Sequence, residues 1–325
     1  MDKVSIIIPV YKAAEFLPRC IDSCINQTYH NIEIIIVIDG SPDNSYEIAK
    51  SYREKYNRLL VINKANEGLP KTRRIGFENS TGDYIFHLDS DDYIEPVTID
   101  LLLKTLHNEN ADVVVGGTRY ENRTGIYITS WLSKVSGSSK TDYLNDLFSL
   151  KLQSNIWGRL IKRKIFEPVF VPSQYNCGED VLANVMMICY APNIKISVEP
   201  TLLYHYVVYN ESLTNTWPAE AFMPFTEEIA KILIESGLEE NVMKSWAYSR
   251  VVNSWRYYLR RGGKTYLRDK KFVHDFYCKY FQIVKDRLTF IERFELILYK
   301  YNQPIAWNFS RIYLKFLKIA KQFSN

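Results

Sequence analysis

The chain has 325 residues, of which 46% are hydrophobic and 24% are charged, and its formal net charge is +4. This composition excludes a disordered chain, a collagen-like repeat and a disulfide scaffold. The first residues lack the basic segment and small-residue cleavage site of a secretory signal, and no uncharged apolar run approaches the roughly 18 residues that cross a bilayer. The five cysteines form no CxxC pair, which favours a reducing compartment. We therefore expect a cytoplasmic protein that is soluble or peripheral to a membrane.

Short apolar runs bounded by polar or turn residues alternate with helical patterns over about the first 115 residues. Between these runs, apolar residues recur at helical spacing in residues 16–25 and 99–106. This alternation predicts an α/β fold with a mostly parallel sheet and helices on both faces. The predicted buried strands are residues 5–10, 32–38, 59–63, 84–88 and 112–115.

Polar clusters follow four of the predicted strands, at the sheet edge where ligands bind in folds of this kind. Tyr11 follows the first strand and residues 39–41 follow the second. Residues 66–68 follow the third strand and residues 89–92 follow the fourth. Because the carboxyl ends of parallel strands share one edge, this coincidence indicates an α/β enzyme.

The acidic cluster after the fourth strand is a candidate metal site. Asp89 and Asp91 are two residues apart, so at the end of an extended segment their carboxylates can point the same way. Mg²⁺ or Mn²⁺ accepts a few carboxylate oxygens and completes its shell with phosphate and water. The alternative interpretation is a solvated acidic turn.

Other candidate residues each have two interpretations. Asp39, where a buried strand reaches the surface, suits hydrogen bonding to a base or ribose, or a turn that caps a helix. Glu179 and Asp180 stand at the start of a helical pattern. One interpretation is a general base, and the other is a pair of acids that the helix dipole stabilises. His205 is either a metal ligand or a structural residue. The basic residues 71–74 either bind a diphosphate or form a solvated helix face.

The charge is distributed unevenly along the chain. Residues 241–325 contain 18 Lys and Arg but only five Asp and Glu, a net charge of +13, and they interleave aromatic with basic residues. The final residues 306–323 show amphipathic helical spacing. We expect peripheral contact between residues 241–325 and an anionic membrane. The alternative is a helical subdomain packed on the body, and nucleic-acid binding is not expected.

Six segments in order resemble the family 2 glycosyltransferases with a GT-A fold: VSIIIPVYK, IEIIIVIDGS, NEGLPKTRRIG, TGDYIFHLDSDDYIEP, NIWGRLIKRKIF and YNCGEDVLAN. The resemblance covers roughly residues 3–215. It implies a Rossmann-like, mostly parallel sheet flanked by helices and a mainly helical C-terminal extension. The implied domains are a catalytic domain at residues 1–217, divided into a nucleotide-binding half (1–115) and an acceptor-side half (116–217), and a helical region at residues 218–325.

The resemblance also implies roles for individual residues. Pro9, Val10 and Tyr11 would line the nucleobase pocket. Asp180 would be the general base, with Glu179 as the alternative. Asp91 would be the direct ligand of Mg²⁺ or Mn²⁺, and Asp89 and His205 are further candidate ligands. The remaining implied contacts to the nucleotide sugar are Asp39, Asn66, Gly68, Arg73, Asp89 and Ser90. Lys12 departs from the family pattern, which frequently has asparagine there.

Enzymes of this kind invert the anomeric centre in a single displacement. The resemblance implies a UDP-linked hexose or N-acetylhexosamine as the donor and a glycan or polyprenyl-diphosphate-linked glycan as the acceptor, at the cytoplasmic face of a bacterial membrane. The sequence does not determine the oligomeric state, and a homodimer is one alternative. One rival function is a sugar-1-phosphate nucleotidyltransferase, although residues 9–12 lack the glycine-rich phosphate loop of that class. The other rival is a catalytically degenerate scaffold of a polysaccharide-assembly complex.

Overall fold

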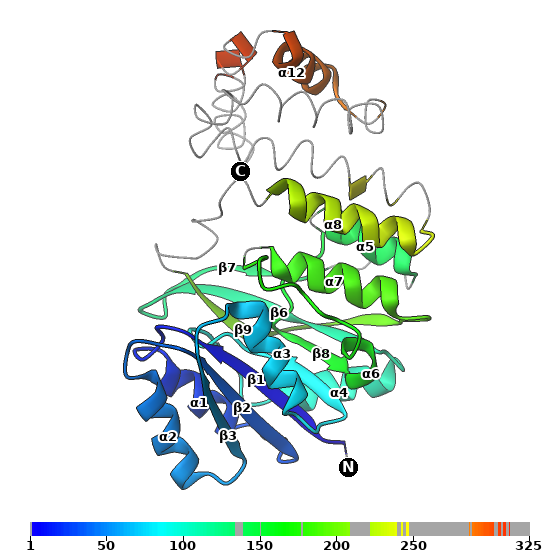
Figure 1. The fold of residues 1–325 in the computed structure, drawn as a ribbon. Helices are drawn as coiled ribbons and strands as arrows, with labels where there is room; N and C mark the ends of the chain where they lie inside the picture. Colours follow the sequence, from blue (N-terminus) through cyan, green and yellow to red (C-terminus); the bar gives the residue numbers. More distant parts are fainter. Residues whose placement is uncertain are drawn as a thin grey trace. The chain divides into compact units, whose positions relative to one another are not determined.

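The computed structural model describes residues 2–133, 139–149, 151–176, 178–208, 222–238 and 288–301, together with residues 242, 245, 246, 286, 305, 306, 308, 309 and 312. The chain divides into two compact units (Figure 1). One comprises Met1–Trp217 and Glu227–Ser236, and the other comprises Pro218–Thr226 and Gly237–Asn325. The predicted domain boundary between residues 217 and 218 lies outside the described residues.

Helices and strands alternate through the first unit. The described strands are β1 (Val4–Val10), β2 (Ile32–Asp39), β3 (Leu59–Lys64), β4 (Tyr84–His87), β5 (Tyr93–Ile94), β6 (Val113–Asn122), β7 (Tyr127–Trp131), β8 (Arg159–Lys162) and β9 (Ile196–Val208). The described helices are α1 (Leu17–Ile25), α2 (Ser45–Lys55), α3 (Leu69–Glu78), α4 (Thr98–Asn108), α5 (Lys140–Phe148), α6 (Arg163–Phe166), α7 (Glu179–Tyr190), α8 (Phe222–Glu235) and α12 (Phe290–Tyr301). The helix α12 belongs to the second unit.

The strands form one sheet in the order β3-β2-β1-β4-β8-β6-β9-β5, and β7 pairs with β6. The first four strands of this order are parallel to one another. Beyond β4 the sheet is mixed, because β8 runs antiparallel to both β4 and β6 whereas β6 and β9 are parallel. The α/β fold class predicted from the sequence is confirmed, and its parallel part carries the loops that follow β1 to β4.

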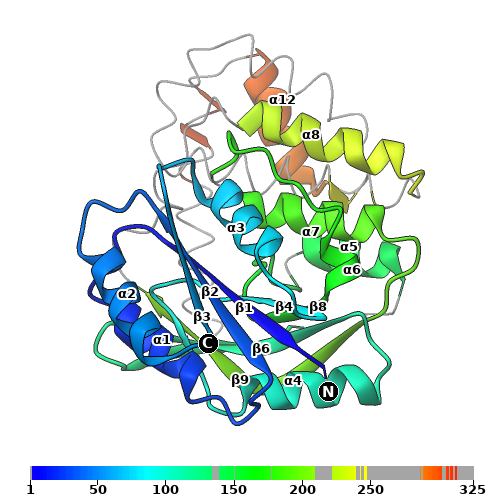
Figure 2. The same ribbon diagram turned by 60° about the horizontal axis from the view of Figure 1, so that its bottom comes forward.

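Helices cover both faces of the sheet (Figure 2). On one face α3 packs against β1 and β2, at Gly76, where a Cβ atom would come within 2.4 Å of the Ile7 side chain. On the other face α1 and α4 bury the apolar stripes that the helical spacing predicted, including Cys20 and Cys24. Cys20 and Cys24 therefore pack in the core, and both thiols are free.

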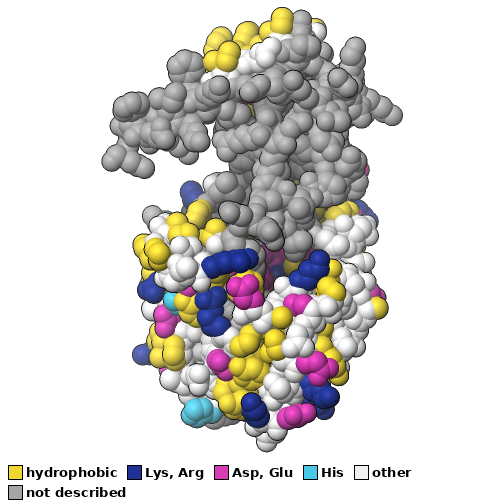
Figure 3. All heavy atoms as spheres, turned by 90° about the vertical axis from the view of Figure 1, so that its left-hand side faces the viewer, with side chains coloured by type: hydrophobic (Ala, Val, Ile, Leu, Met, Phe, Trp, Pro, Cys, Tyr) yellow, Lys and Arg dark blue, Asp and Glu magenta, His cyan; other side chains and the backbone are white. Residues whose placement is uncertain are grey.

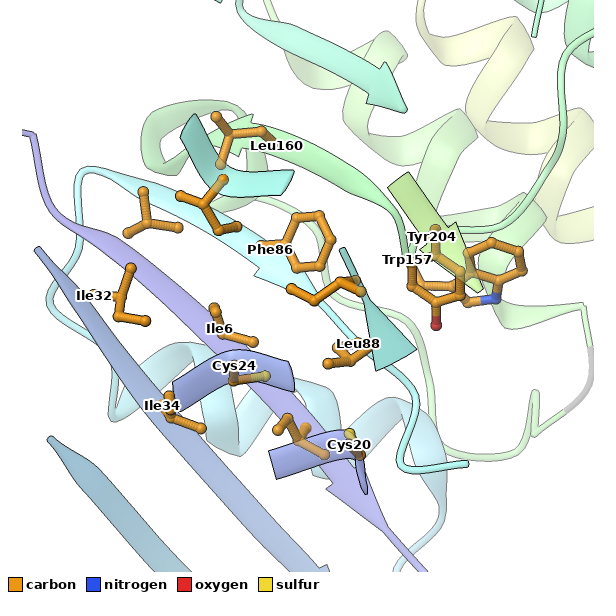
Figure 4. Packing of buried hydrophobic residues seen from close by; sticks show 14 of the residues in the cluster. Ile6, Cys20, Cys24, Ile32, Ile34, Phe86, Leu88, Trp157, Leu160 and Tyr204 are labelled. Carbon is orange, nitrogen blue, oxygen red and sulfur yellow. The ribbon is translucent and has the colours of Figure 1, made fainter. Parts of the chain in front are cut away.

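The core continues from the parallel strands into the mixed part of the sheet (Figure 4). Ile6 and Phe86 pack with Leu160 of β8, and Trp157 stacks on Tyr204 of β9 with ring centroids 4.2 Å apart. Because one apolar cluster spans both parts, the predicted nucleotide-binding and acceptor-side halves share a single core. The strand β6 also runs across residue 115, the predicted boundary between those halves.

The predicted strands agree with the structure to within one residue at nearly every end. The exception is the predicted strand at 112–115. It is only the start of β6, and β6 does not lie next to β4 in the sheet. The antiparallel β8 lies between it and β4. Four residues of β8, RLIK, are too few to show a strand periodicity, which explains why the sequence does not predict this insertion.

Glu33 on β2 links this strand to β1 and to the segment before β4, and it gives the fold a testable acid sensitivity. Its carboxylate accepts hydrogen bonds from the Ser5 hydroxyl and the Thr81 backbone N–H, both at 2.6 Å, and pairs with Lys3. Although burial opposes the charged form, these contacts lower the pKa of Glu33 to about 2. Its stabilising contribution is present above the unfolded pKa of about 4.5 and is lost as the pH falls toward 2.

Between pH 4.5 and pH 2, we therefore expect wild type to lose about 2 kcal/mol more of its free energy of unfolding than Glu33→Gln does. Urea denaturation across this pH range measures the difference. The exposed Glu47→Gln is the control and should follow wild type. Parallel pH profiles for wild type and Glu33→Gln would contradict this role of Glu33.

Candidate active site

Asp39 holds the loop after β3 against the end of β2. Its buried carboxylate accepts backbone hydrogen bonds from Glu67 at 2.9 Å and Gly68 at 3.0 Å, and it pairs with Lys64. The Asn66 side chain donates to the Asp39 carbonyl at 3.0 Å. These contacts place three predicted site residues together. Whether Asp39 also contacts a nucleobase stays a prediction, because its two oxygens already serve this loop.

Two glycines allow the loops to approach this closely. At Gly40, where φ is +61°, a Cβ atom would lie 2.6 Å from the backbone nitrogen of Asn66. Gly68, with φ of +89°, precedes α3, and its Cβ would lie 2.2 Å from the Asn176 side chain. Only glycine combines these dihedrals with so little space. The Asp-Gly and Asn-x-Gly patterns in the sequence therefore correspond to a packed junction of two loops.

Asp43 ties the loop after β2 to the loop after β1. Its carboxylate accepts hydrogen bonds from the hydroxyls of Ser41 and Ser45 at 2.6 and 2.7 Å, and from the backbone N–H of Ala14 at 2.9 Å. These donors outweigh burial and lower the pKa of Asp43 to about 2. The Ser41 hydroxyl in turn accepts from the Lys12 backbone N–H at 2.8 Å. Asp43 therefore holds the loop after β2 against the residues that follow β1.

The residues predicted to line the nucleobase pocket differ in exposure. Pro9 and Val10 are buried within β1, whereas Tyr11, just beyond it, is 45% exposed. Lys12 has a φ of +53°, a conformation in which asparagine is enriched among residues other than glycine. This dihedral gives a physical reason for the asparagine that the family resemblance implies at this position. Tyr11 is thus the side chain of this group that can reach a ligand directly.

Arg73 on α3 joins three carboxylates from distant parts of the chain. Its guanidinium pairs with Asp180 at 2.7 Å, with Glu179 at 3.1 Å and with Asp89 at 2.9 Å. The Arg73 side chain is 7% exposed. Asp89 follows β4, while Glu179 and Asp180 form the first turn of α7, so this one cation connects the acidic loop with the predicted base. The predicted contact between Arg73 and a diphosphate stays a prediction.

Burial dominates the protonation of the two acids on α7. It raises the pKa of Glu179 to about 8, with the neighbouring Asp180 adding to the rise and Arg73 opposing it. Burial likewise raises the pKa of Asp180, against the opposing effect of Arg73. Because the two acids repel each other, they titrate as a pair. An acid pair with a raised pKa can accept a proton near neutral pH, as a general base must.

The loop after β4 turns its acids in different directions. Asp92 is buried and accepts hydrogen bonds from the Tyr204 hydroxyl at 2.7 Å and the Val207 backbone N–H at 2.9 Å, both from β9. The Tyr204 hydroxyl also accepts from the Asp89 backbone N–H at 3.2 Å. The acidic loop is therefore anchored by β9, and Ser90 within it is buried as well.

The donor set of this loop fits a hard divalent cation. Asp91 is half-buried, and burial together with the charge of Asp89 raises its pKa to about 7, so a cation there would offset an existing electrostatic cost. Within the residues that the structure describes, no three His, Cys, Asp or Glu side chains come together as a metal-binding group. Mg²⁺ is commonly held by one or two carboxylates and completes its shell with phosphate and water. The loop therefore suits an ion that arrives with a diphosphate.

His205 on β9 lies between two acids. Its Nε2 is 2.8 Å from Glu95, its Nδ1 is 3.4 Å from Glu121, and its ring stacks on Tyr93 at 4.2 Å. Tyr93 also donates a hydrogen bond to Glu121. Both ring nitrogens thus have protein partners, and the ligand role of His205 stays a prediction.

A buried network that the sequence does not predict positions the start of α7. The Asn184 side chain donates to the Asp180 carbonyl at 2.8 Å and accepts hydrogen bonds from Tyr143 at 2.5 Å and Arg159 at 2.9 Å. Arg159 is fully buried and its charge lowers the pKa of Asp180 against the larger effect of burial. In the sequence, only Arg159 in the NIWGRLIK segment points to this network. Its partners Tyr143 and Asn184 are 16 and 25 residues away.

The surface around these residues is mixed in charge. On the face shown in Figure 3, acidic side chains lie recessed between Lys and Arg side chains. A cavity of about 20 Å³ is lined by Arg73, Glu179, Ile156 and Phe166 among others. Its volume suits about one water molecule.

Comparison with known proteins agrees with this arrangement. A model of glycosyl transferase family 2 matches residues 5–178. The glycosyltransferase GlyA of Streptococcus pneumoniae is 35% identical over 225 residues, which are 66% of this chain and 32% of GlyA. The uncharacterized glycosyltransferase EpsJ of Bacillus subtilis is 30% identical over 207 residues, 62% of this chain and 60% of EpsJ. The chain thus spans less than two thirds of the length of these relatives.

Solved structures show the same fold. Residues 1–349 of S. aureus TarS in complex with UDP-GlcNAc match with a TM-score of 0.74 at 18% identity, covering 96% of this chain and 92% of that one. The mannosyltransferase PcManGT from Pyrobaculum calidifontis in complex with GDP-Man and Mn²⁺ matches with a TM-score of 0.56 at 16% identity. The match covers 78% of this chain and 71% of PcManGT. With the family model matching more than half of its length and the GT-A fold in place, the chain belongs to glycosyl transferase family 2.

Proposed function

We propose that this glycosyltransferase is an inverting, metal-dependent enzyme that transfers a hexose or N-acetylhexosamine from a UDP-linked donor to a hydroxyl of a glycan or lipid-linked glycan in bacterial surface polysaccharide synthesis. The observation that carries the proposal is the convergence of Asp89, Glu179 and Asp180 on Arg73. It places the acidic loop after β4 and the acid pair of α7 at one site, as a single displacement requires. The donors of two structural neighbours, UDP-GlcNAc and GDP-Man, support a nucleotide sugar.

In this proposal Asp180 is the general base. The acceptor hydroxyl gives its proton to Asp180 while its oxygen attacks the anomeric carbon, and the bond from that carbon to the diphosphate oxygen breaks. A carboxylate has about four lone-pair positions, so Asp180 can accept this proton while Arg73 and the Ile156 backbone hold it in place. The reaction needs no covalent enzyme intermediate.

Other residues bind and orient the donor. Tyr11 and the loop held by Asp39 face the nucleobase and ribose, and Asp43 keeps the pocket mouth in shape. Asp91, with Asp89 beside it, would hold Mg²⁺ or Mn²⁺. Such an ion stabilises negative charge on the leaving diphosphate. Arg73 keeps Asp89 and Asp180 in fixed positions relative to each other.

The proposed site of action is the inner face of the plasma membrane. Residues 241–325 carry a net charge of +13 and would hold the enzyme on anionic lipid, next to a polyprenyl-linked acceptor. Within the described residues, no helix is both long and apolar enough to cross a bilayer.

A panel of nucleotide sugars with Mn²⁺ tests the proposal by release of nucleoside diphosphate. We expect release from one UDP-sugar by wild type and its loss in Asp91→Ala and in Asp180→Ala. Asp100→Ala, an exposed acid on α4, is the matched control and should keep full activity. Release that survives both site substitutions would refute the assignment. No release from any donor, with no nucleotide binding, would favour a non-catalytic scaffold.

A further inference from the structure

The helix α12 turns an apolar face outward. Phe290 is 83% exposed, Phe294 43%, Ile297 39% and Tyr301 76%. These residues are spaced by four, three and four positions, which places them along one side of a helix. We call these four residues the α12 face. Large apolar side chains in such a stripe normally face a core or a partner, because burying them is favourable.

The acids of the same helix turn the opposite way. Glu292 is 6% exposed and Glu295 is 3% exposed, whereas Arg293 is exposed. Glu292 accepts a hydrogen bond from the Thr289 backbone N–H at 2.9 Å, and the Thr289 hydroxyl accepts from the Glu292 N–H at 3.3 Å. A helix on a water-exposed surface usually shows the reverse pattern, with acids outside and apolar residues inside. The described outward surface of α12 is therefore apolar and cationic.

The charge of the surrounding chain decides between partners for this face. Residues 241–325 carry a net charge of +13, so a second copy docked on the α12 face would bring two strongly positive regions together. Nucleic acid would match the charge but offers no apolar phase for Phe290 and Ile297. An anionic bilayer offers both, since its interface accepts Phe and Tyr rings and its headgroups attract Lys and Arg.

We infer that the α12 face is the surface that enters the lipid interface, with Phe290, Phe294, Ile297 and Tyr301 in the acyl boundary, while the net positive charge of residues 241–325 attracts anionic headgroups. The inference rests on the proposed membrane contact of residues 241–325 and names the surface that makes it. It requires membrane binding with an apolar component, which salt weakens but does not abolish.

Sedimentation of the full chain with vesicles tests the inference. The vesicles contain phosphatidylglycerol mixed with phosphatidylcholine, or phosphatidylcholine alone. The variant is Phe290→Glu/Tyr301→Glu, because these two side chains are the most exposed of the face. The matched control is Ile234→Glu, which places the same acid at a 67% exposed isoleucine of α8. We expect the double variant to partition about tenfold or more weakly onto anionic vesicles, with the control unchanged.

Several outcomes would overturn the inference. They are equal partitioning of wild type and the double variant, no binding of wild type to anionic vesicles, and a wild-type dimer that the double variant dissociates in size-exclusion chromatography. The last result would assign the face to a second copy. Nucleoside diphosphate release from a soluble donor is measured in parallel. If release is absent in every protein but the difference in lipid binding persists, the proposed transfer reaction fails and the membrane surface stands.

Discussion

Asp180→Asn is expected to lower kcat by about 10²- to 10⁴-fold while the affinity for the donor nucleotide stays close to that of wild type. Asparagine keeps the size of the side chain and can still accept a hydrogen bond from Arg73, so the start of α7 should stay in place. It cannot take a proton from the acceptor hydroxyl. Steady-state kinetics with donor and acceptor, and calorimetric titration of the nucleotide, measure the two quantities separately.

Glu179→Gln is the matched comparison, because it changes the adjacent acid in the same way. Glu179 also pairs with Arg73, at 3.1 Å compared with 2.7 Å for Asp180. We expect a smaller loss of kcat, since Asp180 is the proposed base and Glu179 only the alternative. A full loss in Glu179→Gln with activity retained in Asp180→Asn would transfer the base function to Glu179.

Arg73→Met is expected to lower the free energy of unfolding by about 3 to 5 kcal/mol, because it leaves three largely buried carboxylates without their cation. Burial already raises the pKa values of Glu179 and Asp180, and without Arg73 these two folded-state pKa values lie further above their unfolded values. The destabilisation is therefore largest at high pH and shrinks as the acids take up protons on acidification. Urea denaturation at pH 8 and pH 5 measures both effects.

Arg74→Met provides the control on the next residue of the same helix. Arg74 forms an ion pair with Glu78 at 2.8 Å, in which the Glu78 side chain is 50% exposed. Because the Arg74 guanidinium also donates to the Glu167 carbonyl at 3.0 Å, we expect its loss to cost about 1 to 2 kcal/mol, less than the loss of Arg73. Equal losses for the two variants, or a loss in Arg73→Met that does not change with pH, would show that the buried carboxylates do not depend on Arg73.

The sequence predicts those parts of the fold whose signal is local. The apolar runs of β1 to β4 and the stripe of α1 are visible because their periodicity lies within a few residues. The loops at the carboxyl ends of these strands follow from the sheet, so the sequence alone is enough to propose Asp39 and Asp91 as site residues. The order of motifs then identifies the family, which the comparisons confirm.

The remaining features depend on contacts between distant residues. In the sequence Asp92 is typical of a solvated acidic turn, but Tyr204, 112 residues later, buries it. Arg73 is one cation among several in a basic helix, but its partners include Glu179 and Asp180, more than 100 residues away. A single sequence shows no pairing between such positions, so only the folded chain shows that these groups form one cluster.

The position of β8 sets the order in which the sheet can be completed during synthesis. When β4 leaves the ribosome, the strand that will pair with its free edge has not been made, because α4, β6, β7 and α5 come first in the chain. The pairing of β6 is delayed in the same way, because its neighbours β8 and β9 are synthesised after it. A nascent chain that ends near residue 115 therefore carries an unpaired edge beside an incomplete core, and such edges favour aggregation. We expect the nucleotide-binding half to need the acceptor-side half in order to fold, so residues 1–115 expressed alone should aggregate rather than form a stable domain.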